Sequence, residues 1–187
     1  SSSFANRLLS EAKNNGTKVS LDPSFLFAQN TDLENNSILD KVDYFFPSRE
    51  EAYQLTKLRD PLQAARKIRT SGTGVVIITL DKDGCLVVSE GVEQFVKLEN
   101  TEPVVDTTGA GDAFCGGFLF ATANGFDLVE ASKIGSAAAA HIIARYGGHE
   151  DPPHVEDLAR ILMKNNETGL AQNLLRRKHP GFLWRKR

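Results

Sequence analysis

The sequence predicts an α/β fold, a three-layer sandwich in which helices cover a mostly parallel sheet. Strand-like and helix-like segments alternate over residues 18–80, and this β-α-β-α-β order implies parallel strands joined by right-handed crossovers. The strongest strand-like segment, residues 74–80, is an apolar run rich in β-branched residues, which is typical of a strand buried on both faces. After residue 80 the pattern changes and predicts antiparallel strands added to the same sheet.

The segment up to residue 80 supplies the parallel part of the predicted sheet. Proline ends the two shorter strands, at Pro23 and Pro47, because it cannot continue a sheet ladder. The clearest helix follows Asp60, which is placed to cap it, with Pro61 in its first position. The expected strands are residues 18–21, 42–46 and 74–80, and the expected helices are residues 33–39, 49–58 and 61–70, after an amphipathic segment over residues 4–12.

The rest of the chain alternates turns and helices. Residues 81–84 are expected to form a turn between antiparallel strands at 85–88 and 94–98. An extended run at 103–105 then leads into helices at 114–124, 131–146 and 155–164. The middle helix contains consecutive alanines at 137–140, which suit close packing on a neighbouring helix.

Length and composition are those of an ordinary globular protein. The 187 residues predict one domain, residues 1–165, and a basic tail, residues 166–187, that we expect to be loosely ordered. A formal charge of −2 gives no overall attraction to nucleic acid or membranes, and no apolar run is long enough to span a bilayer. Two cysteines do not make a disulfide framework, so a cytoplasmic location is expected.

The segment from Asp106 to Phe114, Asp-Thr-Thr-Gly-Ala-Gly-Asp-Ala-Phe, is the most informative part of the chain. Its glycines fall where an extended run turns into a helix. At such a junction unpaired backbone N–H groups converge and the helix macrodipole adds partial positive charge, so a phosphate is the natural ligand. Asp112 lies in the expected first helical turn, either as a simple cap or as a group with a chemical task.

Two common phosphate-binding motifs do not match this segment, each because a required residue is missing. The dinucleotide fingerprint G-x-G-x-x-G has Phe114 where its third glycine belongs. The P-loop G-x-x-x-x-G-K-[ST] fits Gly111 and Gly116, but Gly117 and Phe118 stand where it needs a lysine and a hydroxyl residue. The remaining possibility is a glycine turn that presents its amides to a phosphoryl group in transfer, with a neighbouring aspartate as general base.

The same segment resembles the second signature, D-T-x-G-A-G-D, of the ribokinase-like (PfkB) family of sugar and nucleoside kinases. The resemblance covers residues 1–165 and is to the C-terminal half of a family member, so we expect a partial chain whose N-terminal part is missing. It implies an ATP-dependent kinase that phosphorylates an alcohol group of a sugar or nucleoside. Asp112 would be the general base, and the amides of Gly109, Ala110 and Gly111 would form the anion hole.

The resemblance also implies a nucleotide site. Ser48 and Glu51 stand where the family has N-x-x-E, and an alternative interpretation of this pair is a helix capping box. Residues 79–84 resemble the family's T-L-G-x-x-G loop, with Asp81 in place of the first glycine; the alternative is a plain turn. The implied ATP contacts are Ser48, Thr79, Gly84, Gly111 and Ser136, and Glu51 would organise Mg²⁺ through water.

A monovalent cation, with K⁺ as the candidate, is the last ligand that the resemblance implies. Asp106, the carbonyl of Thr108 and the turn around Gly147 would hold the ion, which would fix the backbone of the glycine turn without touching substrate. The plain alternative for Asp106 is an Asx-turn. Asp106 also follows an extended run, as Asp22, Ser48 and Thr79 do, so we expect these four residues along one edge of the sheet.

Two other classes of function stay open. One is a non-catalytic nucleotide-binding or interaction module built on a truncated kinase scaffold. The other is a dinucleotide-dependent enzyme, which the missing third glycine disfavours. The resemblance does not identify the acceptor, because the family's acceptor contacts lie in the N-terminal half.

Overall fold

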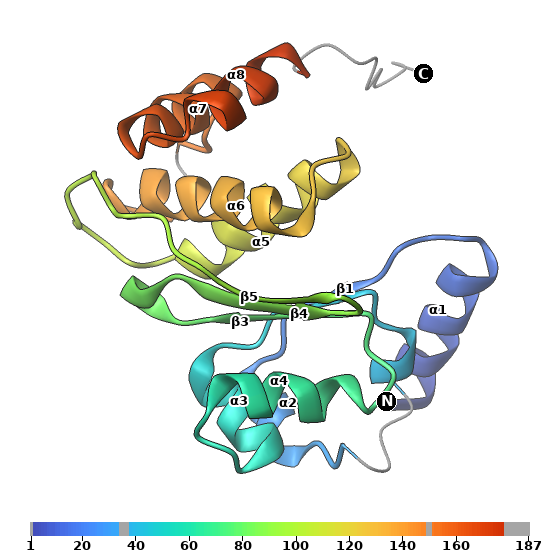
Figure 1. Cartoon of the computed structure of the whole chain (residues 1–187). Coiled ribbons are helices and arrows are strands. Elements are labelled where there is room, and N and C mark those ends of the chain that lie inside the picture. The colour runs from blue at the N-terminus through green and yellow to red at the C-terminus, as the bar shows by residue number, and fades with distance from the viewer. Residues whose placement is uncertain (1, 34–37, 149–150, 178–187) are drawn as a thin grey trace. The chain divides into compact units, whose positions relative to one another are not determined.

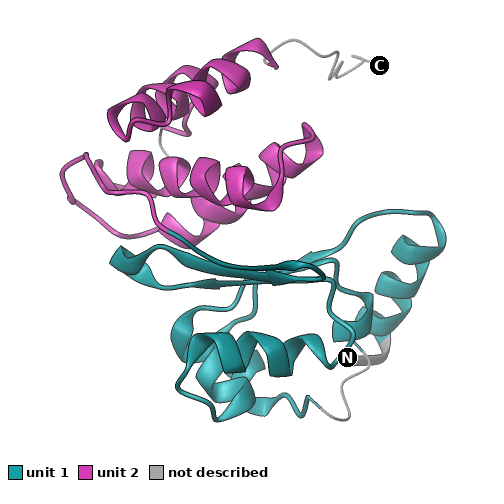
Figure 2. Ribbon diagram, in the orientation of Figure 1, with its two compact units in different colours: residues 1–96 teal, residues 97–187 magenta. Residues whose placement is uncertain are grey.

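The computed structural model describes residues 2–33, 38–148 and 151–177 (Figure 1). The chain divides into two compact units, residues 1–96 and 97–187 (Figure 2). The first unit contains the sheet, and the second contains the glycine turn.

A five-stranded sheet in the order β1-β2-β3-β4-β5 forms the centre of the first unit. Its strands are β1 (Ser20–Leu21), β2 (Tyr44–Phe45), β3 (Val75–Thr79), β4 (Cys85–Ser89) and β5 (Val92–Val96). The first three strands are parallel to one another, whereas β4 pairs antiparallel with both β3 and β5. The α/β class is confirmed, but the sheet is mixed rather than mostly parallel, because its antiparallel pairs, β3–β4 and β4–β5, are as many as its parallel pairs, β1–β2 and β2–β3.

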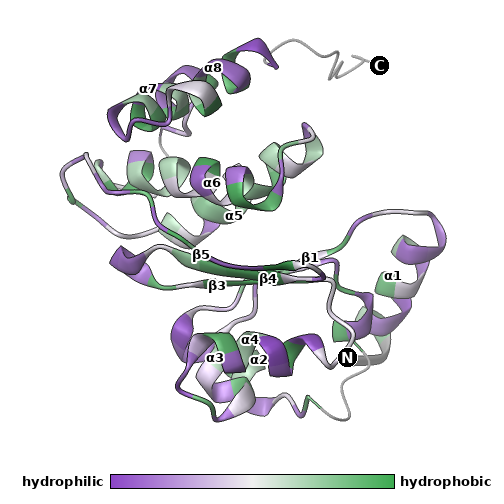
Figure 3. Ribbon diagram, viewed as in Figure 1, coloured by the Kyte–Doolittle hydropathy of each residue, from purple (hydrophilic) through white to green (hydrophobic). Residues whose placement is uncertain are grey.

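Burial explains why β3 and β4 lie in the middle of the sheet. Val76, Ile77 and Ile78 are fully buried, as are Leu86 and Val87 on the neighbouring strand. Figure 3 shows both strands in the green of hydrophobic residues. Alternate side chains point to opposite faces of a strand, so uninterrupted burial means that solvent is excluded from both faces.

The helices of the first unit are α1 (Ser2–Asn14), α2 (Phe25–Asn30), α3 (Arg49–Thr56) and α4 (Pro61–Arg69), with short 3₁₀ turns η1 (Leu39–Lys41) and η2 (Asp81–Asp83). Helices α2, α3 and α4 lie on the same side of the sheet in Figure 1. Asp60 caps α4 by accepting a hydrogen bond from the Gln63 N–H at 2.8 Å, and Ala65 and Ile68 of this helix are fully buried. The predicted cap, first-turn proline and apolar face of α4 are therefore confirmed.

The second unit consists of α5 (Ala110–Ala123), α6 (Leu128–Ile143), α7 (Val155–Lys164) and α8 (Thr168–Arg176). Small residues let α5 and α6 approach closely. A Cβ atom added to Gly117 would lie 2.9 Å from the Cβ of Ala138, and one added to Gly135 would lie 2.8 Å from the Phe114 carbonyl oxygen. The close packing predicted for the alanine-rich helix is confirmed, although α6 begins earlier, at an Asp127–Glu130 capping box.

One predicted element was wrong, and another lies largely outside the described residues. Residues 34–37 of the helix predicted at 33–39 lie outside the described residues, and Leu39 begins the 3₁₀ turn η1. The structure also has a helix that the sequence did not predict, α2, which Ser24 caps by accepting from the Phe27 N–H at 3.2 Å. Residues 103–105 form no strand, since the N–H of Val105 donates to the Ile143 carbonyl at 2.8 Å, at the end of a helix. A strand needs a neighbouring strand to complete its ladder, and this segment has a helix end instead.

The tail is more ordered than predicted. Residues 168–176 form α8, which buries Leu170, Ala171 and Leu174, so the expectation of loose order was wrong for this stretch. Arg177 ends the helix by donating to the Asn124 carbonyl at 2.6 Å and by stacking over Phe126. The most basic part of the predicted tail, residues 178–187, lies outside the described residues. Within the described ranges, no helix combines the length and the apolar character needed to cross a bilayer.

Candidate functional site

The carboxyl ends of β1, β2 and β3 place three predicted residues along one edge of the first unit's sheet. Asp22 follows β1, Ser48 follows β2, and Thr79 is the last residue of β3. Ser48 and Thr79 pair directly as a parallel bridge, and the Thr79 N–H donates to the Pro47 carbonyl at 3.0 Å. The shared edge is therefore confirmed for these three residues, and it is the edge at which open α/β folds bind ligands.

Ser48 and Glu51 form a complete capping box at the start of α3. One carboxylate oxygen of Glu51, Oε2, accepts from both the N–H and the hydroxyl of Ser48 at 2.8 Å, and the Ser48 hydroxyl accepts from the Glu51 N–H at 3.3 Å. These bonds satisfy helix donors that would otherwise lack partners. The plain interpretation of the pair is thus confirmed, and the second oxygen of Glu51 is not used by the box.

The turn after β3 closes on itself. The Leu80 N–H donates to the Gly84 carbonyl at 2.8 Å, and the Gly84 N–H donates to the Asp81 carbonyl at 3.2 Å. Asp81 has a φ angle of 53°, in the left-handed region that favours glycine. The backbone at this position therefore has the shape that glycine would give, although the residue is aspartate.

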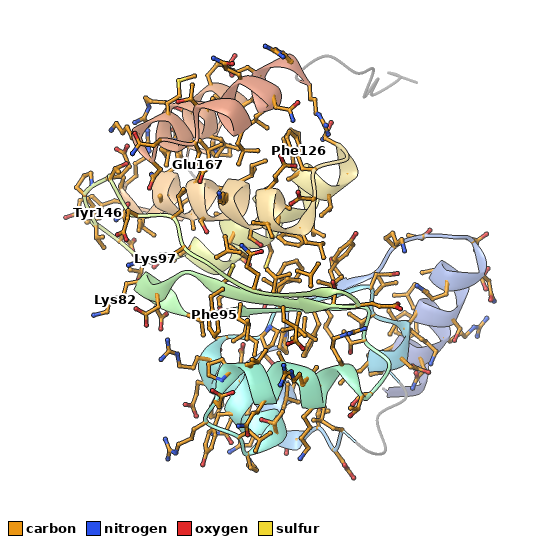
Figure 4. The ribbon with its side chains drawn as sticks, viewed as in Figure 1. Lys82, Phe95, Lys97, Phe126, Tyr146 and Glu167 are labelled. Atoms are coloured by element: carbon orange, nitrogen blue, oxygen red, sulfur yellow. The ribbon has the colours of Figure 1, made fainter. Side chains whose placement is uncertain are left out.

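An ion pair joins this turn to the start of α3. Arg49 Nη2 lies 2.9 Å from Asp83 Oδ2, so the capping box and the turn are held together at the sheet edge. Lys82, on the same turn, is exposed and points outward in Figure 4. The sequence interpretation missed the Arg49–Asp83 contact, because both residues stand at unspecified positions of their motifs and the two are far apart in the chain.

The glycine turn of the second unit leads directly into α5. Gly109 caps the helix with a φ angle of 79°, and a Cβ atom there would lie 2.7 Å from the Gly148 carbonyl oxygen, so only glycine fits. The Ala110 N–H donates to the Thr107 carbonyl at 3.2 Å. Among the described residues, the N–H groups of Gly109, Gly111 and Asp112 have no hydrogen-bond partner.

These N–H groups begin a 14-residue helix. Gly111 and the side chain of Asp112 are exposed, so a ligand has access to the start of α5. Unpaired amides and the positive end of the helix dipole favour an anion here. The carboxylate of Asp112 stands in the same turn, where it can accept a proton from a group that approaches the amides.

Asp106 ties the glycine turn to the turn that follows α6. Its Oδ1 accepts from the Thr108 N–H at 2.9 Å, and its Oδ2 accepts from the Gly147 N–H at 3.3 Å. Hydrogen bonds from the backbone and side chain of Thr108, followed by the one from Gly147, hold the pKa of this carboxyl below its usual range. The predicted Asx-turn is present, and so is the predicted proximity of Asp106 to Gly147.

The oxygens at this point are suited to a hard cation, which prefers carboxylate and carbonyl ligands. The Thr108 carbonyl faces Gly148, since a Cβ added to Gly148 would collide with its oxygen. The described residues include no cluster of three or more histidine, cysteine, aspartate or glutamate side chains able to hold a metal. A cation here would therefore depend on one carboxylate and backbone carbonyls.

The structure gathers the predicted residues into two groups. Ser48, Glu51, Thr79 and Gly84 lie together in the first unit, while Asp106, Thr108, Gly109, Ala110, Gly111, Asp112 and Gly147 lie together in the second. Ser136 is half-buried on α6. Besides the Arg49–Asp83 pair, the sequence interpretation did not identify how closely Gly148 approaches Gly109, which only the folded chain reveals.

Known proteins resemble this chain over most of its length. Residues 1–155 match the sequence model described as pfkB family carbohydrate kinase. An uncharacterised sugar kinase from Archaeoglobus fulgidus is 36% identical over 139 residues, which are 74% of this chain and 55% of that protein.

Solved structures of ribokinases superimpose on this chain. Ribokinase from Thermotoga maritima superimposes with a TM-score of 0.72 at 31% identity, covering 83% of this chain and 52% of that one. Arabidopsis thaliana ribokinase, solved with ribose and ATP, gives a TM-score of 0.71 at 25% identity and covers 87% of this chain and 53% of that one. The chain thus spans about half the length of the proteins it matches.

Proposed function

Because the chain belongs to the pfkB family of carbohydrate kinases, we propose that it carries the nucleotide and general-base part of an ATP-dependent kinase that phosphorylates an alcohol group of a sugar or nucleoside. The observation that carries the proposal is the start of α5. There an exposed carboxylate, Asp112, stands in the same turn as unpaired backbone N–H groups.

Phosphoryl transfer depends mainly on alignment and on stabilising charge. In the proposed reaction, the acceptor hydroxyl oxygen bonds to the γ-phosphorus of ATP while the bond to the β,γ-bridging oxygen breaks and ADP leaves. Asp112 takes the hydroxyl proton as general base. The amides of the Gly109–Ala110–Gly111 turn donate to the oxygens of the group in transfer.

The sheet edge of the first unit supplies the proposed nucleotide contacts, Ser48, Thr79 and Gly84. Mg²⁺ would neutralise phosphate charge, and the Glu51 oxygen that the capping box does not use is available to a water in its shell. Ser136 and Gly111 complete the proposed ATP contacts, and Asp106 with Thr108 and Gly147 forms the proposed monovalent cation site. ATP and ribose are seen bound to the Arabidopsis relative, which supports this class of substrates.

The substitution Asp112→Asn tests the general base. We expect phosphate transfer from ATP to fall by about 10²- to 10⁴-fold, the usual contribution of a general base, with ATP affinity retained. The assay pairs ATP with ribose, fructose and nucleosides, in this chain and in any longer protein that contains it. Turnover close to the parental rate would exclude Asp112 as the base.

A non-catalytic nucleotide-binding or interaction module is the alternative function. Calorimetry separates the two functions. ATP binding without phosphate transfer to any acceptor, in the longest protein that carries the chain, would support the module and contradict the kinase.

A further inference from the structure

A buried histidine stands out in the last turn of α6. His141 is 1% exposed and lies among the small and aliphatic residues of the helix, including Ala140 and Ile142. Its Nε2 is 3.1 Å from the carbonyl oxygen of Asp151. Because a carbonyl oxygen only accepts hydrogen bonds, Nε2 must carry the proton.

The other ring nitrogen has no such bond. Nδ1 of His141 is buried without a hydrogen-bond partner among the described residues, and the nearest carboxylate, that of Asp157 on α7, lies 3.9 Å away. A buried polar atom left unpaired is destabilising. Packing alone would be served better by an aliphatic side chain, so the histidine is explained by the bond that Nε2 makes.

Arg145, which lies four residues after His141, binds the same aspartate. Its Nε lies 2.9 Å from Asp151 Oδ2, and its Nη1 donates to the His141 carbonyl at 2.8 Å. Asp151 is thus bound through its backbone by the histidine and through its side chain by the arginine. These contacts hold Asp151 at the last turn of α6.

Two residues that precede Asp151 in the chain, Gly147 and Gly148, support the glycine turn. Gly147 donates to Asp106, and Gly148 lies against Thr108 and Gly109. The last turn of α6 also binds the backbone that leads into the glycine turn. The N–H groups of Val105 and Asp106 both donate to the Ile143 carbonyl, at 2.8 and 3.2 Å. The glycine turn is therefore positioned by the same helix end to which His141 fastens Asp151.

We propose that His141 is a positioning residue: by binding the Asp151 carbonyl through Nε2–H, it keeps Gly147 at the Asp106 carboxylate and so fixes the glycine turn for phosphoryl transfer. Its effect on catalysis rests on the function proposed above. Its effect on the backbone is independent of that function, so the effect on the backbone and the effect on catalysis can be tested separately.

Two substitutions distinguish the hydrogen bond from the volume of the ring. His141→Gln keeps an N–H donor in reach of the Asp151 carbonyl, whereas His141→Leu fills a similar space without a donor. The readout is amide hydrogen exchange of Gly147 in the whole chain, without ligand. We expect exchange about tenfold faster in His141→Leu, as for the loss of one buried hydrogen bond, and near the parental rate in His141→Gln.

Ser132→Ala is the matched control, because Ser132 is a buried polar residue of the same helix that donates to the Leu128 carbonyl at 2.7 Å, away from the turn. We expect it to leave Gly147 exchange unchanged. Equal exchange in both His141 variants would overturn the proposal, as would faster Gly147 exchange in the control.

Should His141→Leu fail to fold, nitrogen chemical shifts of the His141 ring in the parental chain decide the matter. A protonated Nε2 supports the proposal, and a neutral ring protonated on Nδ1 alone refutes it. In the kinase assay we expect kcat to fall in His141→Leu and to recover in His141→Gln, with the KM for the acceptor unchanged. If Gly147 amide exchange is not faster in His141→Leu, the positioning role is refuted, whether or not Asp112 proves to be the base.

Discussion

The carboxylate of Asp106 accepts a hydrogen bond at 3.3 Å from the backbone N–H of Gly147, 41 residues further along the chain. The same carboxylate accepts from Thr108, two residues ahead of it. One side chain therefore joins the glycine turn to the turn after α6. The link depends on the charge of the carboxylate, because a protonated carboxyl is a weaker acceptor and carries a donor of its own.

The hydrogen bond from Gly147 to the Asp106 carboxylate should be lost only when the pH falls below the usual pKa of an aspartate. Hydrogen bonds from Thr108 and then Gly147 lower the pKa of Asp106 in the folded chain. A carboxyl whose folded pKa is depressed contributes stability above its unfolded pKa, about 3.9, and loses that contribution as pH falls through the lower folded value. We expect the Gly147 amide proton shift to titrate with a midpoint below 3.9. A midpoint at or above that value, or an unchanged titration in Asp106→Asn, would contradict the link.

Replacing the helix-capping glycine should be costly. Gly109→Ala combines a left-handed backbone with a Cβ that would lie 2.7 Å from the Gly148 carbonyl oxygen. We expect the free energy of unfolding to fall by about 2 kcal/mol or more, measured by urea denaturation. Gly116→Ala on the same helix is the control. A Cβ there meets nothing within 4 Å, so this change should stabilise the chain by about 0.5–1 kcal/mol. Equal effects of the two substitutions would refute the steric argument.

Glu51 offers a test that separates helix capping from magnesium binding. Glu51→Gln keeps an oxygen that can accept both bonds from Ser48, so stability should stay near parental. Glu51→Ala removes both bonds and should cost about 1 kcal/mol in unfolding free energy. If the free oxygen also serves Mg²⁺, Glu51→Gln raises the Mg²⁺ concentration needed for half-maximal kinase activity. The control is Glu50→Gln, an exposed neighbour outside the box. An unchanged Mg²⁺ requirement in Glu51→Gln would leave capping as the role of this residue.

Local signals made much of the fold predictable. The Asp60 cap with Pro61 marked the start of α4, and the β-branched run marked β3, because both patterns are complete within a few residues. The six-residue helix α2 was missed, since its only strong signal is the capping Ser24. The extended pattern of residues 103–105 does not reveal that their hydrogen-bond partner is the carbonyl of Ile143, at a helix end, rather than a neighbouring strand.

At the candidate site, too, local patterns could be predicted, while contacts between distant segments could not. The glycine turn and the Ser48–Glu51 box could be predicted because each lies within one short segment. The proximity of Asp106 to the turn around Gly147 was expected only from a family resemblance, and the His141–Asp151 contact was not expected at all. Such contacts between distant segments have no local pattern, so only the folded chain shows them.

The turn after β3 provides the last test, since Asp81 adopts a φ angle of 53° where glycine is favoured. The left-handed conformation costs a residue with a side chain about 1–2 kcal/mol, and glycine loses about 0.5–1 kcal/mol more entropy on folding. We therefore expect Asp81→Gly to raise the free energy of unfolding by about 0.5–1 kcal/mol in urea denaturation. Lys82→Gly, at a neighbouring position without a positive φ, should lower it by a similar amount. Under the proposed function, losing this carboxylate also tightens ATP binding, because it removes a negative charge from beside the triphosphate. A loss of stability in Asp81→Gly equal to that in Lys82→Gly would show that the aspartate is not strained.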